Sequence, residues 1–464
     1  MRTIILIGIF LFSTLFIKAQ GDIDTTKNNY QIKQIEVTGN KKTKKHIIIR
    51  ELPMQIGDSI SDKEILAFCK KAEENIMNLS LFNFVTVTVS KEKTQLLIHI
   101  DVSERWYLWP MPFLVISDRN FNSWLEKKDI KRLTYGLFLL KDNCRGRNEK
   151  LQILAAYGYN EQIGFSYSIP YINKEKTWGM KFLSLYQRTH ESPYATIDNK
   201  EKFLRLENSY AKTNFEGFIE FNYRKNIHNY HRFRMEYNQI SVDDSLLLLN
   251  PNYLHSTSTE YLLLNYKFKH DYRNYIHYPL TGHYFDFEVS KYGLQIFDKK
   301  INHTKAWITA RKFMRVSEKT YFATELRGGI KFSKNNDYVF SQALGYNNDY
   351  VRSYEYYVTD GQGFVLAKTN LKYELLPKRE KVFSFIPWEK FNHLHYAIYL
   401  NFFTDAAYVY QKNPDISNTL SNKILFGSGV GLDFVTYYDM VFRLEYSWNP
   451  IYQGGFFIHF TAPI

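Results

Sequence analysis

The chain has 464 residues and a net charge of +13, and aromatic residues make up 17% of it although 23% is charged. Beyond the N-terminus no stretch approaches the roughly 18 continuous apolar residues of a spanning helix, and the mean hydropathy is −0.38. These values exclude a helical membrane protein. Lysine and arginine are dispersed among tyrosines and apolar residues instead of forming a patch, which argues against nucleic acid as a partner.

The N-terminus has the pattern of an export signal. Arg2 precedes an apolar run over residues 4–17, and Lys18-Ala19-Gln20 follows it. Such a run is too short to span a bilayer comfortably and ends at a small residue, as secretory signals do. We therefore predict a signal peptide over residues 1–19 and a short linker over residues 20–30. An N-terminal membrane anchor is the alternative.

Residues 31–106 predict a small α+β domain in the order strand, helix, helix, strand, strand. The first strand closes on a Gly-Asn pair and a Gly-Asp pair separates the helices. Both pairs favour turns, because glycine adopts positive φ at little cost. Apolar residues in the second helix recur every three or four positions, so one face can cover a sheet. The marker residues of this domain are Gly39, Asn40, Gly57, Asp58 and Phe82.

From residue 132 to the C-terminus, side chains change character at every second residue, as in β-strands. Near the end, for example, Phe442, Leu444 and Tyr446 alternate with Arg443 and Glu445. A soluble sheet could show this pattern in one strand, but its repetition and the aromatic content favour a transmembrane β-barrel. At ~20 residues per strand with its connection, roughly sixteen antiparallel strands fit. We predict a linker over residues 107–131 and the barrel over residues 132–464.

Motifs in both regions resemble the BamA/TamA family of outer-membrane assembly factors. The small domain resembles a POTRA domain, and the barrel region resembles a β-barrel of the bacterial surface antigen type. DYR and PLTG at residues 271–282 are similar to the family's D-x-R…P-x-x-G turn, and FTDAA at residues 403–407 is similar to its F-x-D-x-G strand. The most specific motif is VRSY at residues 351–354, which resembles the V-R-G-[FY] tip of a hairpin that folds into the lumen.

This resemblance implies that the loop inserts Arg352 among carboxylates of the barrel interior. Asp405 is the expected partner, and Glu374 is a second candidate on the polar face of the preceding strand. A guanidinium held in this way makes bidentate, charge-assisted hydrogen bonds, so we expect the bridge to pin the loop rather than to perform covalent chemistry. The other residues of the predicted loop tip are Val351, Ser353 and Tyr354.

Three features depart from the family pattern or are left open. Ser353 replaces a glycine, which costs on the order of 1 kcal/mol if the position requires positive φ. Phe457 and Phe460 mark the predicted closing strand, but the chain runs on over residues 461–464. A late predicted strand contains Gly427, Gly429 and Gly431. Two interpretations are open: these glycines leave room for the inserted loop, or they allow close packing at a bend of the barrel.

The sequence predicts no enzyme, no cofactor and no metal site. It lacks a G-x-S-x-G elbow, an H-E-x-x-H motif and a phosphate-binding glycine loop. The thirteen histidines are scattered, and Cys69 and Cys144 are interpreted as structural thiols.

By its resemblance the chain is expected in the bacterial outer membrane, with its POTRA domain in the periplasm. The implied function is to assist insertion or translocation of polypeptides by strand templating. Expected partners are outer-membrane lipid and unfolded outer-membrane or secreted polypeptides, and accessory lipoproteins are left open. The alternative is a passive outer-membrane channel or a dedicated secretion pore. The POTRA domain favours the first function, since a mere pore needs no module that binds clients.

Overall fold

The computed structural model describes residues 29–116, 132–333, 337–346, 349–384, 387, 389–436, 438, 440–451 and 454–460. The predicted signal peptide and the last four residues lie outside these ranges. Within the described ranges no helix has the length and apolar character needed to cross a membrane.

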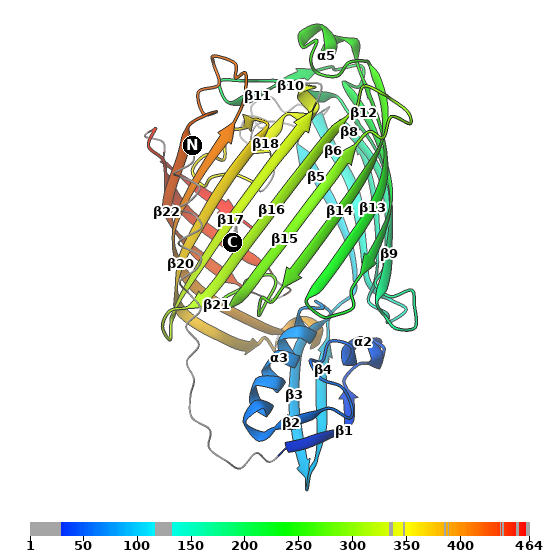
Figure 1. Ribbon diagram of the computed structural model, residues 1–464, viewed down its shortest axis with the longest axis vertical. Coiled ribbons are helices and arrows are strands. Elements are labelled where there is room, and N and C mark those ends of the chain that lie inside the picture. Colours follow the sequence, from blue (N-terminus) through cyan, green and yellow to red (C-terminus); the bar gives the residue numbers. More distant parts are fainter. Residues whose placement is uncertain are drawn as a thin grey trace.

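A small α+β domain lies beneath a large barrel of tilted strands (Figure 1). Its sheet has the order β2-β1-β4-β3, in which only the β1–β4 pair is parallel. The predicted element order is confirmed, with the short strand β2 as an addition. The elements are β1 (Asn29–Thr38), α2 (Lys45–Ile49), β2 (Ser59–Ser61), the 3-10 helix η1 (Asp62–Glu64), α3 (Ile65–Met77), β3 (Phe82–Glu92) and β4 (Gln95–Glu104).

The predicted apolar face of α3 packs on this sheet. Phe68, Ala72 and Ile76 of the helix are buried together with Phe82 of β3, which is fully inaccessible to solvent. Full burial of one such aromatic ring contributes about 1.5–3 kcal/mol. Ser61 forms a capping box with Glu64 at the start of η1, the 3-10 turn that leads into α3.

Sixteen antiparallel strands form the barrel, as predicted from the alternation. They are β5 (Leu108–Ile116), β6 (Leu133–Cys144), β7 (Glu149–Gly158), β8 (Asn160–Ile169), β9 (Trp178–Thr189), β12 (Lys212–Tyr223), β13 (Asn229–Val242), β14 (Ser258–Asp271), β15 (Gly282–Tyr292), β16 (His303–Arg315), β17 (Thr320–Ser333), β20 (Gly363–Val382), β21 (His393–Tyr410), β22 (Ile424–Val435), β23 (Val441–Trp448) and β24 (Gly454–His459).

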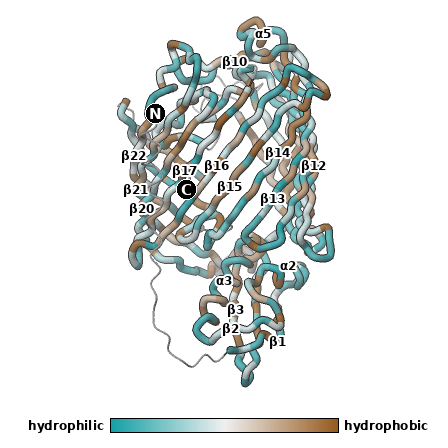
Figure 2. Tube along the Cα trace, in the orientation of Figure 1, coloured by the Kyte–Doolittle hydropathy of each residue, from teal (hydrophilic) through white to brown (hydrophobic). Residues whose placement is uncertain are grey.

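Apolar side chains face outward and polar side chains face the interior. In β23, Arg443 and Glu445 are buried, whereas Leu444, Tyr446 and Trp448 are exposed on the outer face. Figure 2 shows the same interleaving of hydrophobic and hydrophilic residues along the tilted strands. The arrangement is that of a barrel with an apolar belt and a polar interior.

The barrel begins earlier than the sequence indicated. Residues 108–116, assigned to a linker, form β5, which pairs with β6 from Leu108↔Lys141 to Ile116↔Leu133. Two prolines at positions 110 and 112 and a nearly continuous apolar run conceal the strand pattern. Proline lacks an N–H and is therefore tolerated chiefly in edge strands, and β5 is the first strand of the sheet.

The first and last strands form the seam of the barrel. The ladder runs from β24 to β5, and among the described residues no hydrogen-bonded pairing joins β24 to β5. The last strand is short, since β24 has 6 residues whereas β22 has 12. Each seam strand is thus paired along one edge only in this part of the chain.

Loops cover the barrel end that lies away from the small domain (Figure 1). The hairpin turn at residues 198–199 contacts the β21–β22 loop, because the Asn199 amide donates to Asn418 Oδ1 at 2.8 Å. The Val358 amide of the β17–β20 loop donates to the Asn199 carbonyl at 2.9 Å. The short elements of the structure outside the barrel wall are β10 (Glu191–Ile197), β11 (Lys200–Arg205), α5 (Asp244–Leu249), η3 (Tyr338–Phe340), β18 (Gln342–Leu344), β19 (Thr359–Asp360) and α6 (Glu389–Asn392).

Candidate functional site: the lumen loop and the lower rim

The β17–β20 loop places Arg352 inside the barrel, against the wall formed by β20 and β21. Arg352 and Asp405 are both fully buried. The guanidinium binds the carboxylate in a bidentate manner, with Nε to Oδ2 at 2.8 Å and Nη2 to Oδ1 at 2.5 Å. The Arg352 amide also donates to Oδ2 at 3.0 Å, so Asp405 holds both the side chain and the backbone of the loop tip.

Two neighbours complete the surroundings of this guanidinium. Asn370 of β20 accepts from Arg352 Nη1 at 2.6 Å, and the ring centroid of Phe403 lies 3.9 Å from the guanidinium carbon. Phe403 and Asp405 are two residues apart on β21 and therefore share its inner face. The FTDAA motif thus supplies a cation–π contact and a carboxylate to the same arginine.

Glu374, the second predicted partner, does not contact Arg352. Its carboxylate accepts from the Tyr321 hydroxyl at 3.4 Å, and the side-chain position next to the guanidinium is taken by Asn370. Both residues face inward on β20, but four residues of strand separate them by about 13 Å. The register of β20 also becomes irregular directly after Glu374. The expectation of two carboxylates is therefore corrected to one carboxylate and one amide.

The loop tip turns at Ser353, the residue that replaces a glycine of the family motif. Ser353 adopts φ +79°, in the region that favours glycine. Its carbonyl accepts from Asn449 Nδ2 at 2.9 Å, which helps to hold the turn. Val351 and Tyr354 are buried in an apolar cluster with Ala407. All four predicted tip residues therefore lie inside the barrel.

A glycine of β22 allows this close approach. A Cβ atom on Gly427 would lie 2.0 Å from the Arg352 carbonyl oxygen, a distance that no side chain can occupy. Gly427 therefore leaves room for the inserted loop. The other two glycines serve the barrel wall, since a Cβ on Gly429 would meet Phe403 and one on Gly431 would meet the β23 backbone.

A second buried ion pair, which sequence reasoning missed, lies nearer the small domain. Arg443 of β23 binds Asp433 of β22, with Nη2 to Oδ2 at 2.6 Å, and both side chains are fully buried. The hydroxyl of Tyr278 donates to Asp433 Oδ2 at 2.7 Å. The only sequence signal was the inward position of Arg443 on its strand.

Tyr278 comes from the β14–β15 turn, which contains the predicted DYR and PLTG motifs. Arg273 and Asp271 form an ion pair there at 2.7 Å. The end of α3 holds the same turn, because Asn78 accepts from the Ile276 amide at 3.0 Å and donates to the Asn274 carbonyl at 3.3 Å. One turn therefore contacts the small domain on one side and the buried Asp433 on the other.

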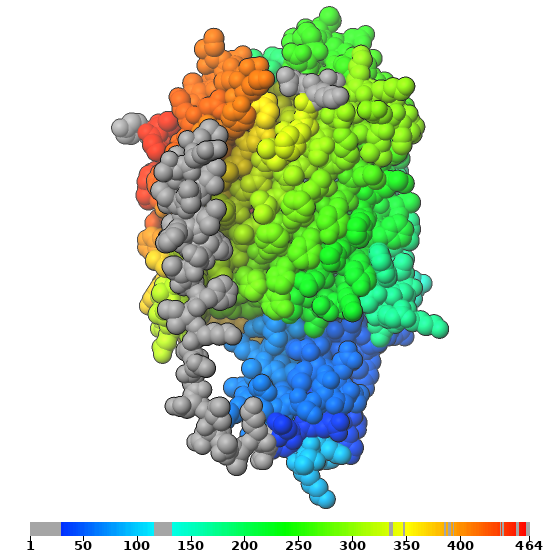
Figure 3. Space-filling model, viewed as in Figure 1, coloured from blue at the N-terminus to red at the C-terminus, as the bar shows by residue number. Residues whose placement is uncertain are grey.

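We call the turns at the barrel end nearest the small domain the lower rim. Arg50 and Glu51, at the end of α2, bind the small domain to further turns of this rim. Arg224 binds the buried Glu51 carboxylate at 2.8 and 2.7 Å. Arg50 donates to the Arg224 carbonyl at 2.6 Å and lies over the ring of Tyr171. Burial and the neighbouring Glu51 raise the pKa of Tyr171 above its ordinary value. Figure 3 shows the small domain packed directly against the rim.

The remaining predicted residues have local roles. Gly39 and Gly57 adopt φ of +78° and +97° in the expected turns. Asn40 donates to the Thr43 carbonyl at 2.9 Å, and Asp58 accepts from the Gln55 amide at 2.7 Å.

In the closing strand, Phe457 lies on the inner face with its ring 5.6 Å from that of Tyr356 in the lumen loop. Phe460 follows β24, and its exposed ring lies 5.7 Å from that of Phe442. The closing strand therefore contacts the loop through its inner face.

Comparisons with known proteins agree with this architecture. The model described as "Surface antigen variable number repeat", a POTRA domain, matches residues 30–105, and the Omp85 superfamily domain matches residues 143–450. No curated protein matches the sequence. The fold is similar to BamA from Haemophilus ducreyi lacking POTRA domains 1–3, with 13% identity, a TM-score of 0.51 and coverage of 93% of this chain and 83% of that one. It is also similar to CdiB from Escherichia coli, with 11% identity, a TM-score of 0.56 and coverage of 92% and 75%. Because the Omp85 model matches more than half of the sequence, the chain belongs to the Omp85 superfamily, as an Omp85-type β-barrel preceded by a POTRA domain.

Proposed function

We propose that this protein acts in the bacterial outer membrane, with its POTRA domain in the periplasm, and assists the insertion or translocation of polypeptides. Its seam strands offer backbone hydrogen-bonding groups to an incoming strand, and no covalent chemistry is needed. The partners are membrane lipid and unfolded outer-membrane or secreted polypeptides. Accessory lipoproteins are further candidates for the POTRA surface.

The seam is the observation that carries this proposal. In the described part of the chain, β5 pairs only with β6, and β24 only with β23. Sheet edges with unpaired N–H and C=O groups bind extended polypeptides by β-augmentation. In hydrocarbon each unsatisfied backbone group costs several kcal/mol, which gives an incoming strand a strong reason to pair. Such a strand needs no energy source beyond its own hydrogen bonds and burial.

A cavity at the lower rim supports delivery of a client from the POTRA domain. It has a volume of about 790 Å³ and lies between α3 and β3 of the small domain and the rim of the barrel. Its walls carry charges of both signs, such as Lys70 and Glu73, beside aromatic rings such as Phe84 and Tyr275. β3 is also the edge strand of its sheet. An extended segment can therefore pair with β3 while its side chains enter this cavity.

The Arg352 bridge has a supporting role in this proposal. The bridge pins the loop within the barrel, where the loop tip packs against the wall strands β21 and β22. A loop held across the interior opposes free diffusion through the barrel, which favours assembly or translocation over a passive channel. The same loop contacts the closing strand, so its position bears directly on one side of the seam.

Site-specific photo-crosslinking in living cells tests the proposal. One probe replaces Phe456 of β24, whose side chain is exposed, and another replaces Thr86, which is exposed on β3 and lines the rim cavity. The matched control is Met235 of β13, an exposed residue on a strand that is paired on both edges.

Unfolded outer-membrane proteins captured at Phe456 and Thr86, but not at Met235, would support an insertase. Repeated capture of one secreted protein would support a dedicated exporter within the same proposal. Capture of no polypeptide at either probe, together with stable conductance in planar bilayers, would overturn it in favour of a passive channel.

A further inference from the structure

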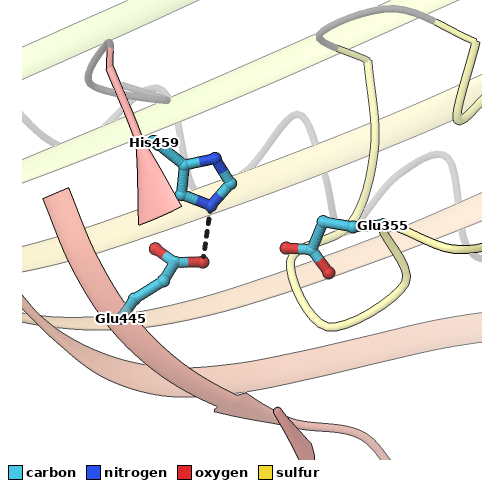
Figure 4. Close-up of side chains that lie close together, drawn as sticks. All are labelled: Glu355, Glu445 and His459. Carbon is cyan, nitrogen blue, oxygen red and sulfur yellow. Dashed lines mark ion pairs between the residues drawn. The ribbon is translucent and has the colours of Figure 1, made fainter. Parts of the chain in front are cut away.

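Three side chains of the metal-binding type meet between the lumen loop and the last two strands (Figure 4). Glu355 belongs to the loop that carries Arg352, Glu445 to β23, and His459 to β24. Their ligand atoms lie within 4.8 Å of one another, and His459 Nε2 is 3.2 Å from Glu445 Oε1.

The buried carboxylate of Glu445 has His459 as an ion-pair partner but accepts no hydrogen bond in the described part of the chain. Glu445 is 2% exposed, and neither of its oxygens accepts a hydrogen bond from the described part of the chain. The Nε2 atom of His459 is also buried without a hydrogen bond. A buried carboxylate without donors costs several kcal/mol, so a group that neutralises this cluster is strongly favoured.

A protonated histidine alone does not balance the cluster. Two carboxylates and one imidazolium leave one negative charge uncompensated among these three side chains. Arg443 lies on the same face of β23, but it directs Nε and Nη2 at Asp433. The Tyr350 hydroxyl lies 3.3 Å from His459 Nδ1. With the proton on Nδ1, that contact leaves the Nε2 lone pair facing the carboxylates, as in histidine ligands of metals.

We propose that Glu355, Glu445 and His459 bind a divalent transition-metal cation of the Zn²⁺ class. Zinc takes histidine nitrogen and carboxylate oxygen at about 2.0–2.2 Å, so its ligand atoms lie up to roughly 4 Å apart. Glu355 is on the lumen loop, and the three ligand atoms lie within 4.8 Å of one another, less than 1 Å beyond this span. A site with imidazole disfavours Ca²⁺ and Mg²⁺, which prefer oxygen ligands alone.

The bound cation would join the lumen loop to the closing strand. Glu355 lies three residues after Arg352, and His459 is the last residue of β24. The sequence predicted no metal site, because it has two cysteines and scattered histidines instead of ligands at short spacings. The fold brings the three ligands together. The site binds metal whether or not the protein assembles polypeptides, so its test is independent of the proposed function.

Metal binding is measured on the full chain purified in detergent and stripped with a chelator. Zn²⁺ is titrated by calorimetry, and Co²⁺ by its visible absorption bands. We expect one cation per chain, no competition by excess Mg²⁺, and an affinity reduced at least ~10-fold in His459→Gln and in Glu445→Gln. Gel heat-modifiability verifies that each variant has a folded barrel.

The matched control is His99→Gln in the POTRA domain. His99 and Glu36 are also 3.2 Å apart, but they form an exposed pair without a third ligand. Binding that survives His99→Gln and is weakened in the two lumen variants supports the site. Binding that is absent from the folded protein, or that is unaffected by His459→Gln and Glu445→Gln, overturns it.

Discussion

Replacing Asp405 by asparagine leaves the fully buried guanidinium of Arg352 without a charge partner. In the parent protein Asp405 accepts from Nε, Nη2 and the backbone N–H of Arg352. Asparagine keeps one oxygen acceptor but turns an amide donor toward the guanidinium. Removing one member of a buried ion pair costs about 3–5 kcal/mol. The unfolding equilibrium should shift by roughly 10²–10⁴-fold, because each 1.4 kcal/mol is a factor of ten.

Urea unfolding in detergent, followed by tryptophan fluorescence and by heat-modifiability on gels, measures this shift. Glu374→Gln is the matched control, since it also neutralises an inward-facing carboxylate, on β20, but does not touch Arg352. We expect it to change the free energy of unfolding by less than about 1 kcal/mol. Arg352→Glu should exceed the effect of Asp405→Asn, because it brings two carboxylates together in the same buried site.

Equal stability of Asp405→Asn and the parent would refute the reasoning, and so would equal destabilisation by Glu374→Gln. A double-mutant cycle with Arg352→Met sharpens the test. If the two residues act as a pair, the double variant should be much less destabilised than the sum of the single variants. Strict additivity would mean that the contact contributes nothing specific.

Three further changes probe neighbouring contacts. Glu51→Gln removes the charge partner of Arg224 and should increase hydrogen exchange at the POTRA–rim contact, while unchanged protection would contradict that role. Tyr278→Phe removes a donor to buried Asp433 and should lower the free energy of unfolding by about 1.5–3 kcal/mol in the urea assay, whereas no change would mean that Asp433 is satisfied without it. Gly427→Val places side-chain atoms against the loop tip and should expose that loop to added protease; a protected loop would show that the backbone can yield.

The barrel could be predicted from the sequence because each strand alternates polar residues, which face the interior, with apolar residues, which face the membrane. In β23, successive residues alternate between the polar interior and the apolar outside. This alternation can be read from the strand's own sequence without knowing which strands lie beside it. β5 escaped prediction for a related reason. Its edge position tolerates Pro110 and Pro112, and these residues resemble a linker when the sheet is not known.

The candidate site was predictable only as far as its motifs extend. Arg352 and Asp405 were predicted because the VRSY and FTDAA motifs that contain them resemble family motifs. Asn370 and Glu374 could not be ranked from sequence, because both face inward on one strand and only the depth of the loop decides between them. The Glu51–Arg224 pair joins segments 173 residues apart, so no local pattern predicts it. Asp433 and Arg443 lie opposite each other in the β22–β23 hairpin, and only the strand register shows that they pair.

The strand β22 links the two buried ion pairs physically. It carries Asp433, which the rim turn reaches through Tyr278, and Gly427, which packs on the backbone of Arg352. The rim turn is in turn held by Asn78 at the end of α3. A packed strand resists shear along its length because its ladder hydrogen bonds on both sides must move with it. A continuous series of contacts therefore connects the POTRA domain to the loop tip. The adjacent strands β23 and β24 form one side of the seam, so the same series of contacts ends where we propose that clients pair.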